Sequence, residues 1–213
     1  MPRAARIVIP GLAHHFTQRG NNRAPVFFEE SDYRQYLTLL REQTAKYSVT
    51  VHGYCLMPNH VHLALIPPLE QALARAVGRT HYRYTQYVNA KYHRSGHLWQ
   101  NRFFSCALDE QHYWTALRYI ERNPSRAKLL LHAADYPWSS ASARLGGVDE
   151  TGLLELISWQ HEMPIAVWQD RLLLPEEDAA VLPLRLATQT GHPLGRKSFL
   201  AECEMLLGRQ IIP

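Results

Sequence analysis

Two histidines at alternate positions of an apolar run constrain this chain more than any other feature of its sequence. The run covers residues 53–67, GYCLMPNHVHLALIP, and contains His60 and His62. The apolar residues on either side of Pro58 and Asn59 predict two strands joined by a tight turn. Because side chains alternate between the faces of a strand, the two imidazoles share one face, about 7 Å apart. Two imidazoles at this separation can bind one metal ion.

The spacing alone leaves two interpretations of the histidine strand open. Histidines on one face of a strand are often ordinary polar surface. The opposite face, however, is wholly apolar, with Val61, Leu63 and Leu65, which indicates a strand in the core. Buried polar side chains need hydrogen-bond or metal partners. The surroundings therefore favour a metal site more than the spacing does.

Length and composition indicate one globular domain, or one domain with an appendage. The chain has 213 residues, of which 46% are hydrophobic, enough for a sizeable core. No apolar run reaches about 18 residues, so we expect no membrane span. The N-terminal apolar stretch is too short for a signal peptide. The isolated Cys55, Cys106 and Cys203 argue against a disulfide framework or zinc cluster and fit a reducing cytoplasm.

Charge is unevenly distributed along the chain. Residues 1–130 contain 17 Lys/Arg and 8 Asp/Glu, a net charge of +9, whereas residues 131–213 contain 6 and 11, a net charge of −5. The two parts give the +4 of the whole chain. A basic first part favours a polyanionic partner, most plausibly nucleic acid. The alternative is a soluble protein whose charges are merely uneven.

Apolar periodicity predicts the element order β-α-β-β-α-β-α up to about residue 130. We expect strands within 5–18, 49–57, 60–66 and 93–108, and helices over about 32–46, 69–92 and 110–122, the first capped by Ser31 or Asp32 and the third by Asp109. The first six elements match a ferredoxin-like split βαβ arrangement, an α+β fold with an antiparallel sheet. We expect a main domain over 1–135 and an acidic, mostly helical extension over 136–213, ending in a helix over 198–207.

Candidate nucleic-acid contacts fall in a polar loop, on the second helix, and among aromatic and basic residues further along. Arginine and asparagine side chains can contact phosphates and bases, and aromatic rings can stack on bases. The candidates are Arg19, Asn21, Asn22, Arg23, Arg75, Arg79, Arg83, Trp99, Arg102 and Arg126. The three helical arginines recur every four residues, and no acidic residue lies between 71 and 93. The alternatives are an ordinary loop, a solvated helix face and a core tryptophan.

Tyr119 lies off the apolar stripe of the third helix. It shares a face with His112, Thr115, Arg122 and Asn123. A tyrosine on the polar face of an anchored helix is either plain surface or a presented nucleophile.

Four stretches of the sequence resemble one known family. MPNHVHL at 57–63, YRYTQYVNAKYHRSGHLWQNRFFS at 82–105, LRYIERNPSRAKL at 117–129 and YPWSS at 136–140 occur in the order found in single-tyrosine transposases of the HUH class. Among these the chain resembles the REP-associated tyrosine transposases, also called IS200-like transposases, over roughly residues 5–140. The combination is specific, although HVH by itself is not.

The resemblance implies a metal-dependent endonuclease and strand transferase for single-stranded DNA. His60 and His62 correspond to the HUH histidines, and Tyr119 corresponds to the nucleophile that forms a 5′-phosphotyrosine. Asn123 occupies the position of the polar residue that completes the metal site, with Mg²⁺ or Mn²⁺ as the implied ion. Pro124 disfavours helical geometry at the residue before it, which leaves the direction of the Asn123 side chain open.

The implied substrate is a hairpin from a repeated extragenic palindrome with a short single-stranded segment at its foot. A monomer is favoured, and a homodimer is the alternative. From its charge, we expect the acidic tail to fold over the active site or the basic face as a regulator. Two other function classes fit the same fold: a DNA- or RNA-binding regulator that has lost catalysis, and a ferredoxin-like RNA-binding module. The second gives the histidines and Tyr119 no joint role.

Overall fold

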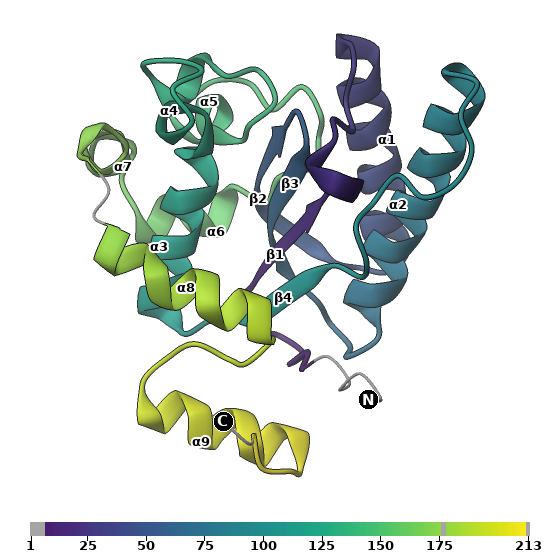
Figure 1. Ribbon diagram of the computed structural model, residues 1–213. Coiled ribbons are helices and arrows are strands. Elements are labelled where there is room, and N and C mark those ends of the chain that lie inside the picture. The colour runs from purple at the N-terminus through teal and green to yellow at the C-terminus, as the bar shows by residue number, and fades with distance from the viewer. Residues whose placement is uncertain (1–6, 176–177, 212–213) are drawn as a thin grey trace.

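An antiparallel sheet of four strands, in the order β2-β3-β1-β4, forms the centre of the structure (Figure 1). The computed structural model describes residues 7–175 and 178–211. The strands are β1 (His14–Arg19), β2 (Thr50–Met57), β3 (His60–Ile66) and β4 (Phe104–Ala107). Met57 pairs with His60 across the tight turn between β2 and β3. The expected α+β, ferredoxin-like architecture is confirmed.

Helices cover both faces of this sheet. In Figure 1, α1 and α2 lie on one side, and α3 and α8 lie on the other. The α-helices are α1 (Glu30–Lys46), α2 (Ala72–Lys91), α3 (Glu110–Glu121), α4 (Asn123–Arg126), α5 (Ala141–Arg144), α6 (Ile157–Glu162), α7 (Ile165–Leu173), α8 (Asp178–Thr190) and α9 (Lys197–Leu207). Two short 3₁₀ helices, η1 (Asn21–Arg23) and η2 (Ala133–Asp135), complete the described elements. None of the helices in the described part of the chain is long and apolar enough to cross a membrane.

The alternation of side chains along β3 divides the interior into two cores. Val61, Leu63 and Leu65 are buried against α1 and α2. Ala64, on the opposite face, joins a second core that contains residues of α3, α7 and α8. His62 lies on the face of Ala64 because it is two residues away along the strand. The histidine face of the sheet is therefore the face that α3 and α8 cover.

The beginnings of the helices differ in detail from the sequence prediction. Glu29, rather than Ser31 or Asp32, occupies the cap position of α1, and Asp32 lies at the third helical position in a reciprocal capping box. Asp109 caps α3 as expected, since its side chain accepts a hydrogen bond from the His112 backbone amide. In a capping box, the side chain of the third helical residue also accepts a hydrogen bond from the backbone at the helix start. Asp32 therefore has the sequence features of a cap although it lies inside the helix.

The C-terminal extension packs tightly onto the rest of the protein. Trp168 of α7 is 0% exposed, and Val181 and Leu184 of α8 are each 1% exposed in the second core. The Trp138 ring stacks on Tyr33 of α1 at a centroid distance of 4.6 Å. Residues immediately after 135 thus contact both α1 and the edge strand β2, where the Leu56 amide donates to the Trp138 carbonyl.

Helix α9 packs on a third, smaller apolar cluster next to the segment before β1. Phe199 and Cys203 are buried there with Ile9. Met205 and Leu206 of the same helix are exposed. The three cysteines are free and buried.

Buried neutral histidines should make the fold sensitive to mild acid. Burial lowers the pKa of His81 to about 3 and that of His14 to about 4, against about 6.5 in an unfolded chain. Between these values the unfolded chain binds more protons, so stability falls as the pH falls below about 6.5. We expect each of these histidines to remove about 1 kcal/mol of unfolding free energy between pH 7 and 5.5.

Urea unfolding at the two pH values measures this effect. His81→Gln should reduce the pH-dependent loss by about 1 kcal/mol, whatever it does to stability at pH 7. His93→Gln, at an exposed position, is the matched control and should leave the loss unchanged. An equal loss in wild type and His81→Gln would contradict the assignment of a neutral, buried His81.

Candidate active site

His60, His62, Tyr119 and Asn123 meet on the α3 side of the sheet. The rings of His60 and His62 are 5.0 Å apart between centroids, and the Tyr119 ring lies edge-on to His62 at 5.4 Å. The Asn123 side chain lies close enough to His60 to raise the pKa of its imidazole. Tyr119 is 5% exposed, His62 5% and Asn123 1%, so the site is largely enclosed.

A break between two helices positions Asn123. Helix α3 ends at Glu121, and Asn123 opens the short helix α4, with Pro124 in its first turn. The sequence placed Asn123 on the same helix as Tyr119, whereas the structure places it on the next turn of chain. Its side chain nevertheless returns to α3, because Nδ2 donates to the Tyr119 carbonyl at 2.9 Å. Oδ1 accepts from Arg126 Nη2 at 2.9 Å, and the two bonds together fix the amide orientation.

Each of the two histidines is held through its Nδ1 atom. His60 Nδ1 lies 2.6 Å from Asn59 Oδ1, and the Asn59 amide nitrogen donates to the Arg23 carbonyl at 3.0 Å. His62 Nδ1 lies 3.0 Å from His15 Nε2. Hydrogen bonds to one ring nitrogen orient a histidine and leave the other nitrogen for a metal. The Nε2 atoms are thus the ones that His60 and His62 can offer to a ligand.

The site keeps its histidines neutral. Burial, reinforced by Arg19 and Arg126, lowers the pKa of His60 to about 4, although Asn123 opposes the shift. Burial lowers the pKa of His62 well below its usual value, and His60 and His15 add to this effect. A neutral imidazole is the form that binds a metal.

Two guanidinium groups flank the Tyr119 ring. Arg126 Cζ lies 5.1 Å from the ring centroid, and Arg185 Cζ, from α8, lies 5.5 Å from it. Arg126 Nη2 is also 3.4 Å from the Tyr119 hydroxyl. Positive charge beside this hydroxyl favours an anionic group such as a phosphate at this place.

The polar loop after β1 lies next to the histidine strand. Arg19 pairs with His60 in the sheet, and the Gly20 amide donates to the Asn59 carbonyl at 2.8 Å. Asn21, Asn22 and Arg23 are exposed on η1. Arg19 and Arg126 are close enough to His60 to lower its pKa, and Arg23 is linked to His60 through Asn59.

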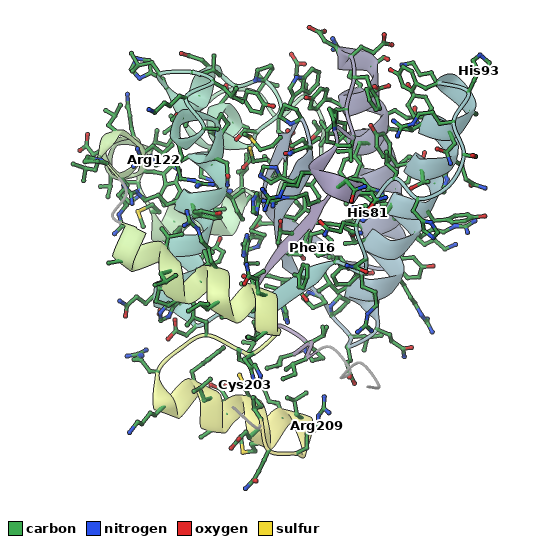
Figure 2. All side chains as sticks on the ribbon, in the orientation of Figure 1. Phe16, His81, His93, Arg122, Cys203 and Arg209 are labelled. Atoms are coloured by element: carbon green, nitrogen blue, oxygen red, sulfur yellow. The ribbon has the colours of Figure 1, made fainter. Side chains whose placement is uncertain are left out.

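The arginines of α2 lie on the opposite side of the sheet from Tyr119. Figure 2 shows this separation through His81 on the α2 side and Arg122 on the α3 side. No acidic residue lies between 71 and 93, but Arg83 forms an ion pair with Glu42 of α1. Arg75 donates to Gln71, and Arg79 lies over the Tyr82 ring at 5.1 Å. The sequence of α2 alone cannot reveal an acidic partner that lies on α1.

Trp99 belongs to the apolar core rather than to the surface. Its ring is 8% exposed and stacks on His81 at a centroid distance of 4.2 Å. The ring faces are therefore not free to stack on bases in this structure. Arg102, by contrast, is exposed nearby. Phe103 is the buried member of the Phe103-Phe104 pair, and Phe104 is exposed.

The sequence prediction did not include three residues that contact the site. His15 of β1 bonds to His62, and Thr188 and Arg185 come from α8. A signal for His15 exists, because it lies on a strand and is the same residue type as the proposed ligands. No local pattern marks the two α8 residues, since their positions depend on how the extension packs.

The donor set suits a divalent cation with open positions. It comprises the two imidazoles and the Asn123 carbonyl oxygen. Mn²⁺ binds both imidazole nitrogens and amide oxygens. Mg²⁺ prefers oxygen ligands, so the Asn123 oxygen suits it better than the imidazoles do. Within residues 7–175 and 178–211, no group of three or more His, Cys, Asp or Glu side chains is arranged to hold a metal ion. The proposed set of His60, His62 and Asn123 contains an amide oxygen, so it is not a group of that kind.

Comparison with known proteins identifies the family. Residues 9–123 match the family described as transposase IS200 like, a segment that includes all four residues of the site. The chain is similar to a solved structure described as the REP-associated tyrosine transposase bound to a REP hairpin, with a TM-score of 0.59 and 18% identity over 73% of this chain and 90% of that one. A putative transposase from Deinococcus radiodurans R1 is similar with a TM-score of 0.40 and 20% identity, over 57% and 97% of the two chains.

No curated protein matches the chain. The match over residues 9–123 nevertheless extends across more than half of the sequence, and the fold agrees with it. The chain belongs to the IS200-like transposase family.

Proposed function

We propose that this transposase is a metal-dependent endonuclease and strand transferase for single-stranded DNA, with Tyr119 as its nucleophile. The observation that carries the proposal is the meeting of Tyr119 and Asn123 with the His60–His62 pair, on a fold shared with a tyrosine transposase. All four residues come from one chain. We therefore favour a monomer whose active site forms in cis, with a homodimer as the alternative.

The proposed metal ligands are His60 Nε2, His62 Nε2 and Asn123 Oδ1. Their other polar atoms are already engaged by Asn59, His15 and neighbouring groups. Mg²⁺ or Mn²⁺ bound there would polarise the scissile phosphate and stabilise the charge that develops on it.

Tyr119 performs the covalent step in this proposal. Its hydroxyl loses its proton as the oxygen attacks the phosphorus, the bond from phosphorus to the 3′ oxygen breaks, and the 3′ oxygen takes up a proton and leaves as a hydroxyl. The 5′ end remains attached as a phosphotyrosine. A 3′-hydroxyl can then attack this phosphotyrosine, rejoin the strand and release Tyr119, so the number of phosphoester bonds is conserved. Arg126 and Arg185 lie where they can stabilise negative charge on the phosphate.

The proposed substrate is a hairpin of a repeated extragenic palindrome with a single-stranded foot. The similar solved transposase is described as bound to a REP hairpin. In this chain, Arg19, Arg23 and Arg126 lie near His60 and supply positive charge for a phosphate backbone. Cleavage and rejoining at such hairpins would serve DNA transposition and recombination.

His60→Ala should abolish metal-dependent cleavage. The protein is incubated with a labelled single-stranded REP-type hairpin and Mn²⁺, denatured, and separated to detect a covalent adduct. Removing one of two imidazole ligands should lower the cleavage rate at least about a hundredfold, because the metal contributes several kcal/mol to the transition state.

His93→Ala, at an exposed position away from the site, is the matched control and should cleave at the wild-type rate. A chelator should inhibit the wild type as strongly as the substitution does. Cleavage by His60→Ala at the wild-type rate would remove the metal assignment, and the absence of any adduct in wild type would remove the nuclease mechanism.

A further inference from the structure

A chain of buried hydrogen bonds connects the C-terminal extension to His62. Thr188 Oγ1, on α8, lies 2.7 Å from the Leu184 carbonyl and 2.8 Å from His15 Nδ1. His15 Nε2 lies 3.0 Å from His62 Nδ1. Thr188, His15 and His62 are 2%, 2% and 5% exposed, so water does not compete for these bonds. Figure 1 shows α8 lying against the β4 side of the sheet, where this chain begins.

The direction of each hydrogen follows from the donor and acceptor capacity of the groups. The Leu184 carbonyl can only accept, so the single hydroxyl hydrogen of Thr188 points to it. Thr188 Oγ1 must then accept from its other neighbours. One of these is His15 Nδ1, which therefore carries a hydrogen. The other is Cys106 Sγ at 3.3 Å, a thiol that burial keeps protonated by raising its pKa to about 12.

The same reasoning continues from His15 to His62. A neutral imidazole carries one ring hydrogen, so His15 with a hydrogen on Nδ1 offers a lone pair at Nε2. His62 Nδ1, at 3.0 Å, must be the donor of that bond. His62 then holds its hydrogen on Nδ1 and keeps Nε2 unprotonated.

We propose that Thr188 of the extension, acting through His15, fixes the tautomer of His62 that can bind a metal through Nε2. Thr188 and His15 are positioning residues, because neither contacts the reacting atoms. The link to metal binding rests on the proposed function, whereas the tautomer itself does not. Outer partners of a metal-binding histidine set its tautomer and ring orientation in this way.

If the donors and acceptors in these hydrogen bonds were reversed, His62 could not bind a metal through Nε2. If Thr188 lacked its hydroxyl, His15 Nδ1 would lose its acceptor and His15 could move its hydrogen to Nε2. His62 Nδ1 would then have to accept, and its own hydrogen would move to Nε2. A protonated Nε2 has no lone pair for a metal. Thr188→Val, which keeps the shape and removes the hydroxyl, should cause this reversal.

Nitrogen-15 NMR of histidine rings in the metal-free protein tests the tautomer directly. We expect His62 and His60 of the wild type to carry hydrogen on Nδ1. In Thr188→Val, His62 should shift towards Nε2–H, while His60 stays unchanged because Asn59 holds it independently. Thr188→Ser, which retains a hydroxyl, should restore the wild-type pattern.

Thr190→Val is the matched control. Thr190 also donates to the carbonyl four residues earlier on α8, at 3.1 Å, and it is exposed. It should leave both histidine tautomers unchanged. Hydrogen on Nε2 of His62 in the wild type would overturn the inference. This measurement uses the wild type alone, so it does not depend on whether a variant folds. An unchanged His62 tautomer in folded Thr188→Val would overturn it too.

Manganese binding supplies the second measurement, by the electron paramagnetic resonance signal of free Mn²⁺. Thr188→Val should bind Mn²⁺ about 10–100-fold more weakly than wild type, since outer-partner substitutions have effects of this size. Thr188→Ser and Thr190→Val should bind as wild type does. A wild type that binds no Mn²⁺ but shows Nδ1–H on His62 would refute the metal part of the proposed function and support the tautomer inference.

Discussion

Tyr119→Phe is expected to eliminate the covalent protein–DNA adduct. The substitution removes only the hydroxyl oxygen, which the proposed mechanism requires as the nucleophile, so cleavage should fall at least about a thousandfold. The hydroxyl has one described hydrogen bond, from Arg126 at a long 3.4 Å. Its loss should therefore change the unfolding free energy by less than about 1 kcal/mol. The adduct is detected by denaturing electrophoresis with a labelled hairpin, and the stability by urea unfolding.

Tyr82→Phe is the matched control for this substitution. Tyr82 is 53% exposed on α2, on the far side of the sheet, and also has a described hydroxyl contact, from Gln86. It should retain the adduct at the wild-type level. A persistent adduct in Tyr119→Phe would show that another tyrosine or no tyrosine is the nucleophile. Loss of the adduct together with loss of the fold would be visible in the unfolding curve.

Glu121→Gln should destabilise the protein by about 3–5 kcal/mol, because it removes the carboxylate charge that pairs with the buried Arg144 guanidinium. Glu121 and Arg144 are both 0% exposed, and Arg144 Nε donates to Glu121 Oε1 at 2.7 Å. The carboxylate also accepts from Ser140 Oγ at 2.6 Å and from Trp168 Nε1 at 2.8 Å. Glu121 thereby links α3 to α5 and α7. In the folded chain, the positive charge of Arg144 balances the negative charge of Glu121.

Glu30→Gln is the control for the Glu121 prediction. Glu30 pairs with Arg34 at 2.6 Å, but the two side chains are 74% and 66% exposed. An exposed pair four residues apart on a helix contributes about 0.5 kcal/mol. Urea unfolding at pH 7 should separate the two variants by at least about 2 kcal/mol. Equal losses of unfolding free energy in Glu121→Gln and Glu30→Gln would contradict a stabilising role of the buried Glu121–Arg144 pair.

Local patterns in the sequence were sufficient for the sheet. The alternation of His60, His62 and Ala64 gave the face of β3, a property of one strand that can be deduced without knowing how elements pack. The apolar stripe of α3 instead suggested a polar face for Tyr119, and this was wrong, because Tyr119 is buried in the second core under the packed extension. The structure then brings the two elements together, but the chemical roles of these residues remain predictions.

Contacts between distant elements could not be deduced in the same way. Glu42 reaches Arg83 from another helix, and Thr188 reaches His15 across 173 residues of sequence. Trp99 gave an ambiguous signal, because an aromatic ring among basic residues fits both a core and a nucleic-acid surface. Its stacking on His81 decides for the core in this structure. Asn123 was uncertain because Pro124 alters the local backbone, and only the helix break shows where its side chain lies.

The packing of the extension changes how its predicted regulatory role is best tested. Trp168 hydrogen-bonds Glu121, and Leu184 lies in the second core. Removing residues 150–213 would expose that core and disturb the fold along with any regulation. Substitutions at exposed α8 positions, such as Leu182 or Leu186, both 53% exposed, leave the core intact. The regulatory role and the division at residue 135 stay predictions.

The position of Thr188 near the end of the chain has a consequence for protein synthesis. Thr188 follows Arg126 by 62 residues, which a ribosome translating 5–20 residues per second needs roughly 3–12 s to add. A nascent chain therefore contains Tyr119 and both histidines for seconds before it contains the hydroxyl that orients His62. Under the proposed hydrogen-bond chain, a transposase still attached to its ribosome, or one released early by a premature stop codon, carries the nucleophile without a correctly prepared metal ligand.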